Sequence, residues 1–322
     1  MFRPGRLLLL AGLIGALCVA FLIGAWRGPG PATAPVQIRI EQGATLTSAA
    51  RTLRKAGAIR SGTLFARLAP ILGGGKPIQA GEYEIPAHAS PAEILARLQS
   101  GKTIQHLITI PEGMPSILVH ERLMAEPLLT GTIAVPEEGS VLPDSYAFGN
   151  GEARAAVLAR MQAAMTAALD DAWAKRTPAA VVSSKRDALI LASIGEKETG
   201  IASERRTVAA VYSNRLRTGM RLQADPTTIY PITKGKPLGR RIRRSELEAV
   251  NGYNTYSMAG LPRGPIANPS RAAIEAVLDP AESQALYFVA DGKGGHVFAR
   301  TLAEHQANVE RYYALRRQRG EM

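Results

Sequence analysis

The chain of 322 residues begins with an apolar stretch that is unlike the rest of it. Leu7 to Trp26 is a run of 20 residues without a charge. As a helix, a run of this length spans about 30 Å, which is enough to cross a bilayer. Arg3 and Arg6 precede the run, so the positive-inside bias places the N-terminus in the cytoplasm and the remaining chain outside it.

A cleaved signal peptide would explain the same pattern, because Ala32-Thr33-Ala34 resembles an A-x-A cleavage site. The apolar run is longer than the core of an ordinary signal peptide, which favours an uncleaved anchor. We therefore expect residues 1–27 to form a cytoplasmic start and a single transmembrane helix of the inner (cytoplasmic) membrane. Residues 28–35 (GPGPATAP) are typical of a short extended linker, and the remaining chain would lie in the periplasm.

Residues 36–102 carry the pattern of a small subdomain. Val36 to Glu41 alternates apolar and polar residues, which predicts a half-exposed strand. Two short helices are predicted over Leu46–Leu53 and Ser61–Leu72, and Gly81–Ile85 is predicted as a second strand. This strand–helix–helix–strand order looks like a LysM-type glycan-binding module. A small packing subdomain without a ligand would show the same order.

Residues 103–322 alternate between helical and strand patterns and predict a larger, mixed domain. The predicted elements are helices over 150–175, Asp187–Thr199 and Ser203–Arg217, and strands over Thr103–Ile110, Ala285–Ala290 and His296–Ala299. We expect a sheet made largely of distant segments. The fold class is therefore α+β, with an N-terminal transmembrane helix, a LysM-like subdomain and a catalytic domain.

Charge and composition narrow the possible partners. The 39 Lys and Arg residues outnumber the 27 Asp and Glu residues, which favours an anionic partner such as nucleic acid, acidic lipid or a cell-wall polymer. No zinc-finger or RNA-recognition signature is present, so we do not expect nucleic acid. Cys18 is the single cysteine, and the five histidines lack metal-ligand spacing. We expect no metal and no cofactor.

The candidate catalytic group is a glutamate at the end of a predicted helix. Glu198 lies in the last turn, just before Gly200, where the helix dipole and apolar neighbours would raise its pKa as a general acid requires. Glu196 points roughly 200° away around the helix, so the two do not form an acid–base pair. Glu196 and Lys197 are candidates for supporting roles. Both glutamates could also be solvated near Lys197 and Arg205.

No second carboxylate is placed with the same clarity. Asp225 is a candidate, although Asp-Pro is also an ordinary turn. Hydrolytic glycosidases generally need two carboxylates, whereas one acid suffices if the 6-hydroxyl of the sugar is the nucleophile. Polar loops nearby contain groups that suit a saccharide cleft, although each alone could be structural. The candidate substrate-binding residues are Gln223, Asp225, Tyr253, Asn254, Thr255 and Tyr256.

Several long motifs together resemble the YceG-like (MltG-type) endolytic murein transglycosylases. They are LPDSYAF, ASIGEKETGIASERRTVAAVYSNRLRTGMRLQADPTTIY, YNTY, GLPRGPIANPS and FVADGKGGHVFARTLAEHQANV, within residues 36–312. The resemblance implies cleavage of peptidoglycan between MurNAc and GlcNAc without water, which leaves 1,6-anhydroMurNAc ends. In the family the catalytic glutamate is the one followed by Thr in E-K-E-T, which matches Glu198. The resemblance also supports the membrane anchor and the LysM-like subdomain.

Two departures and two alternatives accompany this resemblance. Arg263 stands where the family commonly has proline, and Ser270 where it commonly has glycine, so the local loop geometry is in question. One alternative function is a muramidase-type hydrolase that uses Asp225 as the second carboxylate. The other is a non-catalytic peptidoglycan-binding scaffold that recruits peptidoglycan synthases.

Overall fold

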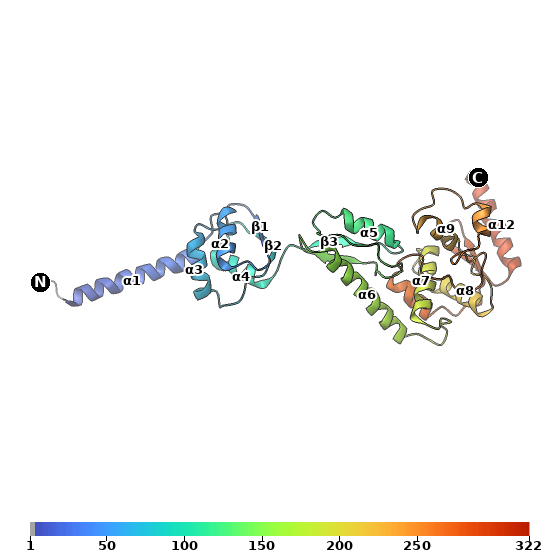
Figure 1. The fold of residues 1–322 in the computed structure, drawn as a ribbon, viewed down its shortest axis with the longest axis horizontal. Coiled ribbons are helices and arrows are strands. Elements are labelled where there is room, and N and C mark those ends of the chain that lie inside the picture. The colour runs from blue at the N-terminus through green and yellow to red at the C-terminus, as the bar shows by residue number, and fades with distance from the viewer. Residues whose placement is uncertain (1–3, 322) are drawn as a thin grey trace. The chain divides into compact units, whose positions relative to one another are not determined.

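The computed structural model of the chain describes residues 4–321, with side chains from residue 12 onward. The described chain divides into two compact units, whose elements are labelled in Figure 1. The first unit comprises residues up to 106 together with 147–151, and the second comprises 107–146 and the residues from 152 onward.

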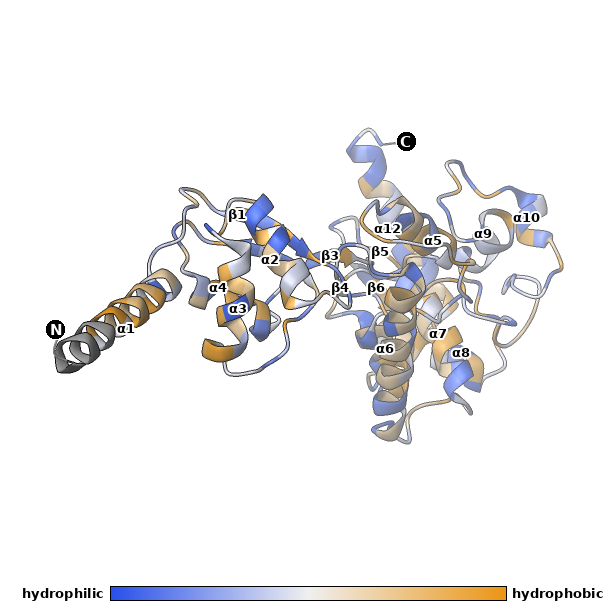
Figure 2. Ribbon diagram, turned by 60° about the vertical axis from the view of Figure 1, so that its left-hand side comes forward, coloured by the Kyte–Doolittle hydropathy of each residue, from blue (hydrophilic) through white to orange (hydrophobic). Residues whose placement is uncertain are grey.

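The first unit begins with the long helix α1 (Pro4–Arg27), and the part of it that Figure 2 colours is largely apolar. Its exposed side chains include Leu13, Ile14, Leu17, Val19, Phe21 and Ile23. Across the described part of the chain, no helix combines the length and the apolarity needed to span a membrane. The transmembrane span predicted over Leu7–Trp26 is therefore not confirmed, and the side chains of residues 7–11 lie outside the described residues.

A small α+β subdomain follows α1. Its elements are β1 (Val36–Ile40), α2 (Leu46–Lys55), α3 (Gly62–Leu72), β2 (Gly81–Ile85) and α4 (Pro91–Ser100). The predicted strand–helix–helix–strand order is confirmed, and β1 pairs antiparallel with β2. The alternation in β1 buries Ile38 and Ile40, which pack in one core with Leu53 and Phe65. Thr45, Ser61 and Ser90 cap the three helices with their side-chain oxygens.

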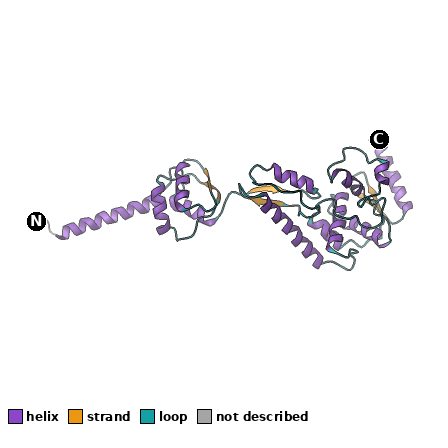
Figure 3. Ribbon diagram, in the orientation of Figure 1, coloured by secondary structure: helices purple, strands orange, loops and turns teal. Residues whose placement is uncertain are grey.

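The second unit is mostly helical, as Figure 3 shows. Its helices are α5 (Ser116–Ala125), α6 (Arg154–Ala174), α7 (Lys185–Glu198), α8 (Arg205–Arg217), α9 (Asp225–Thr233), α10 (Arg244–Glu248), α11 (Arg271–Leu278) and α12 (Leu302–Gln318). β5 (Tyr287–Ala290) and β6 (His296–Ala299) form an antiparallel hairpin in which Tyr287 lies opposite Ala299. β3 (His106–Thr109) pairs with β4 (Ser145–Phe148).

The core of the second unit surrounds α11, which contacts α6, α7 and α8. Ile194, Val208 and Ile274 are fully buried there, and alanines between them allow the helices to approach closely. This core fixes the end of α7 beside α8. The mixed α+β class is confirmed. The expected sheet of distant segments is wrong, because the described strands form three separate two-stranded sheets.

Two local predictions are also corrected around residues 223–248. Gln223 to Thr227 was predicted as a loop, but α9 begins at Asp225, with Pro226 in its first turn where a proline costs no hydrogen bond. The spacing of Ser245 and Glu248 also predicts a capping box, but α10 begins at Arg244, so Glu246 takes the place of the capping carboxylate. The backbone N–H of Arg243 donates to Glu246 over 2.7 Å.

Candidate active site

A cavity of about 370 Å³ in the second unit contains the predicted catalytic glutamate. The end of α7, one face of α8, the start of α9, the hairpin and the start of α12 all contribute to its wall. The lining residues are Glu198, Tyr212, Arg215, Gln223, Asp225, Tyr256, Tyr287, Phe288, Leu302 and His305. The cavity is therefore lined by acidic, basic, amide and aromatic side chains.

Glu198 is the last residue of α7. The helix ends there because Thr199 adopts an extended backbone, with φ −141° and ψ 131°. Burial is the main cause that raises the pKa of Glu198 to about 7, and the negative charge of Asp225 acts in the same direction. A hydrogen bond with Tyr212 and the charges of His296 and Arg215 oppose this rise. Glu198 is therefore substantially protonated near neutral pH, and the causes are its burial and the charge of Asp225.

Tyr212 and Arg215 of α8 were not predicted as site residues. Tyr212 is buried, and its pKa is raised by burial and by the neighbouring Glu198. Arg215 donates to the carbonyl oxygens of Leu286 (2.7 Å) and Leu222 (2.5 Å), which fixes its guanidinium beside the cavity. The sequence signal was present: Val208, Tyr212 and Arg215 recur at helical spacing on the buried face of α8.

Three of the predicted substrate-binding residues lie together with Glu198. The hydroxyl of Tyr256 donates to Oδ1 of Asp225 over 2.6 Å. Gln223 adopts φ +50°, a left-handed backbone that is uncommon for a residue with a side chain, and its N–H donates to the carbonyl of Thr255. This conformation accompanies the placement of the Gln223 side chain in the cavity wall.

Asn254 and Thr255 do not line the cavity. The side chain of Asn254 is fully buried, and its amide donates to the carbonyls of Glu246, Leu247 and Ala249. The hydroxyl of Thr255 is buried against Thr227, 2.8 Å away. Their hydrogen-bonding groups are therefore occupied within the chain. The prediction that both contact the substrate is not supported, and they shape the loop that carries Tyr256.

Tyr253 also lies outside the cavity wall. Its ring packs on Tyr230, with 4.8 Å between centroids, and the guanidinium of Arg263 lies 4.7 Å from its ring centre. Arg263 is one of the two residues at which the sequence departs from the common family pattern. Its contact with Tyr253 gives that arginine a structural role in the loop.

Glu196 points away from the cavity, as its helical spacing predicts. Its Oε2 accepts hydrogen bonds from the N–H (2.7 Å) and the hydroxyl (2.5 Å) of Ser270, the residue that caps α11. Arg205 lies 3.8 Å from its other carboxylate oxygen. Lys197 donates to the carbonyl of Gly113 over 3.4 Å. These two residues therefore join α7 to α11 and to the loop before α5.

The hairpin and α12 complete the wall with residues that the sequence did not single out. His305 stacks on Tyr287, with 5.2 Å between centroids, and burial lowers the pKa of His305. Behind the wall, Nδ1 of His296 lies 2.7 Å from Oε2 of Glu204, and its ring meets Phe288 edge-on. Within the described residues, no group of three or more His, Cys, Asp or Glu side chains is arranged to hold a metal ion.

The profile of the YceG-like family matches residues 38–311. The chain belongs to the YceG-like family. Among its relatives, the "endolytic murein transglycosylase" of Bacillus subtilis strain 168 is 28% identical over 309 residues, which are 86% of this chain and 84% of the relative. The protein of the same name from Streptococcus pneumoniae strain D39 is 28% identical over 85% of this chain, and the match covers 58% of that longer relative.

A solved structure supports the fold of this YceG-like chain. The crystal structure of a putative yceG-like protein from Listeria monocytogenes matches with a TM-score of 0.53 and 26% identity. The match covers 85% of this chain and 98% of the other.

Proposed function

We propose that this YceG-like protein is an endolytic murein transglycosylase. It would cleave the MurNAc–GlcNAc bond within peptidoglycan glycan strands, without water, and leave 1,6-anhydroMurNAc ends. The observation that carries the proposal is Glu198, a carboxyl group in a polar cavity whose pKa is raised to about 7. The names of the Bacillus and Streptococcus relatives support the same activity.

In the proposed reaction, Glu198 acts first as an acid and then as a base. Its proton passes to the glycosidic oxygen while the bond between that oxygen and C1 of MurNAc breaks. The 6-hydroxyl oxygen of the same MurNAc then bonds to C1, and its proton returns to the Glu198 carboxylate. The acid is regenerated. The reaction consumes no water and requires no second catalytic carboxylate.

The other lining residues suit the binding of a sugar. Tyr287 and Phe288 offer aromatic surfaces on which pyranose rings can pack. The Gln223 amide can both donate to and accept from sugar hydroxyl or N-acetyl groups. Asp225 keeps its hydrogen bond with Tyr256 and contributes negative charge near Glu198.

A muramidase-type hydrolase is the second candidate, because Asp225 lines the same cavity as Glu198. In that reaction Asp225 would activate water or attack the sugar. The two reactions differ in product: hydrolysis leaves a reducing MurNAc that contains solvent oxygen. The test is digestion of purified peptidoglycan in ¹⁸O-labelled water, followed by mass spectrometry of the strand ends.

Unlabelled anhydro ends are expected, whereas ¹⁸O-labelled reducing ends would overturn the proposal. Glu198→Gln should give neither product. Glu196→Gln, which alters a glutamate that points away from the cavity, is the matched control and should retain the anhydro product. A non-catalytic scaffold would support cell growth equally well with Glu198→Gln, so complementation with this variant tests that third possibility.

We also propose that α1 anchors the protein in the inner membrane, with the second unit in the periplasm, and that the β1–β2 subdomain is a LysM-like module that binds glycan. The charge-free run and the exposed apolar side chains of α1 support the anchor. The strand–helix–helix–strand order supports the module. Peptidoglycan synthases are the proposed protein partners.

Resistance of the full chain to carbonate extraction would support the anchor, together with digestion of the second unit by protease added outside the inner membrane. Release by carbonate would overturn it. The dissociation constant for glycan strands should be lower when the subdomain is present than when it is absent. Equal dissociation constants would overturn the proposal that the subdomain binds glycan. If no synthase copurifies with the chain after cross-linking in cells, the partner proposal fails.

A further inference from the structure

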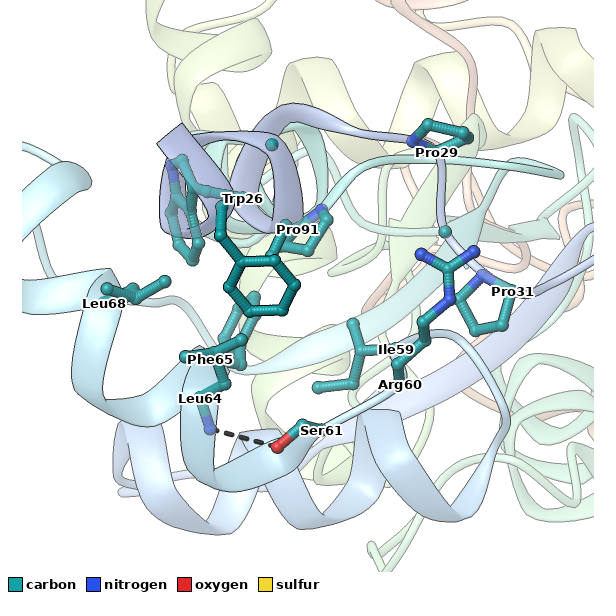
Figure 4. A pocket seen from close by; sticks show the side chains of 14 residues that line it. Trp26, Pro29, Pro31, Ile59, Arg60, Ser61, Leu64, Phe65, Leu68 and Pro91 are labelled. Atoms are coloured by element: carbon teal, nitrogen blue, oxygen red, sulfur yellow. Dashed lines mark hydrogen bonds between the residues drawn. The ribbon is translucent and has the colours of Figure 1, made fainter. Parts of the chain in front are cut away.

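The first unit contains a second, more apolar cavity of about 520 Å³ where α1 meets the subdomain. Figure 4 shows Trp26 and Leu68 toward one end, Phe65, Leu64 and Ile59 along it, and Arg60 with Pro29 and Pro31 toward the other. Its remaining lining residues are Phe21, Gly24, Ala25, Gly30, Ser61 and Pro91. Apart from Arg60 and Ser61, every residue in the lining is apolar or a glycine.

This cavity opens beside the exposed apolar surface of α1. Phe21, Gly24 and Ala25 belong to α1 and line the cavity, and Phe21 is 71% exposed. Phe21 therefore belongs both to the cavity wall and to the surface that carries Leu13, Ile14 and Leu17. The apolar lining of the cavity therefore continues onto the exposed face of α1.

The charge at the cavity specifies the headgroup. Arg60 is exposed and makes no ion pair with any residue that the structure describes. Its guanidinium lies at the opposite end from Trp26 (Figure 4). Arginine binds phosphate through paired N–H donors. The cavity thus presents an apolar slot with a free cation at one end.

We propose that this cavity binds one aliphatic chain of an anionic phospholipid, with the headgroup phosphate at Arg60. The lipid would hold the subdomain against the end of α1. The proposal does not depend on the transglycosylase reaction. It concerns a site in the other unit of the chain.

Trp26 provides the readout. The chain has two tryptophans, so Trp173→Phe leaves Trp26 as the sole tryptophan, which excitation at a wavelength beyond tyrosine absorption reads selectively. The full chain in a non-brominated detergent is titrated with phosphatidylglycerol whose acyl chains are brominated, and in parallel with phosphatidylcholine of the same chains. We expect saturable quenching of Trp26, at several-fold lower concentration for phosphatidylglycerol.

Gly24→Leu blocks the cavity at a position where an added Cβ meets no atom within 4 Å, and leucine favours the helix over glycine. This variant should lose the saturable quenching. Gly15→Leu is the matched control: it is on the same helix, is equally unobstructed and lies outside the cavity. It should behave as the parent does.

Arg60→Gln should weaken the binding of both lipids, because both carry the phosphate, and should weaken phosphatidylglycerol more, so that its preference is lost, because only phosphatidylglycerol carries a net negative charge. Circular dichroism confirms that each variant folds. Equal quenching in the parent and Gly24→Leu, or no headgroup preference in the parent, would overturn the proposal.

Discussion

The phenolic oxygen of Tyr256 lies 2.6 Å from Oδ1 of Asp225 and donates a hydrogen bond to it. This bond joins the loop after α10 to the first residue of α9. Burial is the main cause that raises the pKa of Tyr256, and the hydrogen bond with Asp225 adds to it. Because Tyr256 remains protonated, it remains a donor. The hydrogen bond orients the carboxylate of Asp225, whose charge raises the pKa of Glu198.

Asp225→Asn should shift the pH dependence of cleavage to lower pH. The negative charge of Asp225 raises the pKa of Glu198, so its removal lowers that pKa below about 7. Glu198 must be protonated to act as an acid, and the alkaline limb of kcat/KM should move down accordingly. The measurement is the rate of anhydro-end formation from pH 5 to 9. Loss of activity at every pH would instead assign Asp225 a direct role in the chemistry.

Tyr212→Phe should shift the alkaline limb of the pH profile of kcat/KM to higher pH. The Tyr212 hydrogen bond lowers the pKa of Glu198 by stabilising its carboxylate, and phenylalanine cannot provide it. The pKa of Glu198 should rise above about 7, so activity should persist to higher pH. The same pH series measures the effect. A shift in the same direction as that of Asp225→Asn would contradict this account of the site.

Glu198→Gln should stabilise the second unit at high pH and leave it nearly unchanged at low pH. The folded pKa of about 7 exceeds the ordinary 4.5, so the folded state binds more protons between these values. Stability of the wild type therefore falls as pH rises from 4.5 to 7 and stays reduced above. The variant does not lose stability in this way. The difference in the free energy of unfolding is at most about 3 kcal/mol.

Unfolding of the second unit can be followed by the fluorescence of Trp173, which packs against its core, in a Trp26→Phe background. Equal stability of wild type and Glu198→Gln at pH 8 would show that the ionised carboxylate is well solvated. The comparison at pH 4 is the internal control.

Asn254→Ala should destabilise the second unit by about 2–4 kcal/mol, because it leaves buried carbonyl groups without a donor and creates a cavity. The amide makes three hydrogen bonds to backbone carbonyls, and its oxygen accepts from Thr228 and from the N–H of Tyr256. The measurement is denaturant unfolding followed by Trp173 fluorescence. Ser257→Ala, which removes a partly buried hydroxyl bonded to two carbonyls of the same loop, should cost less. If the two variants lower the free energy of unfolding equally, the buried amide of Asn254 is not what stabilises this loop.

Glu196→Ala should cost about 3 kcal/mol, since it removes the buried acceptor of Ser270 and leaves Arg205 without its buried counter-charge. Glu112 also pairs with Arg205 but is exposed, so Glu112→Gln should cost less than about 1 kcal/mol. Unfolding measured in denaturant compares the two. The pH dependence of activity should be the same in both variants, because Glu196 supports the helix and does not exchange the proton. A shift of the alkaline limb of the pH profile in Glu196→Ala would indicate that Glu196 takes part in the proton transfer.

The features that could be predicted from the sequence are those determined by residues close together along the chain. Ser61 identifies a helix start because a cap bonds within its own turn. Glu198 was placed at a helix end by Gly200 and by its apolar neighbours. The role of Asn254 could not be predicted, since its partners in Glu246, Leu247 and Ala249 are set by how the loop folds back. The wall residues Tyr287 and His305 come from a hairpin and a helix about 100 residues away from Glu198 along the chain.

Arg215 gives the cavity a fixed positive charge beside Glu198. Its Nε and Nη1 donate to the carbonyls of Leu286 and Leu222, which holds the side chain in place, and a guanidinium keeps its charge at any physiological pH. When Glu198 releases its proton, a compensating cation already stands nearby. The transient anion therefore needs no mobile ion from the surrounding medium, and turnover should depend little on the identity of the buffer salt.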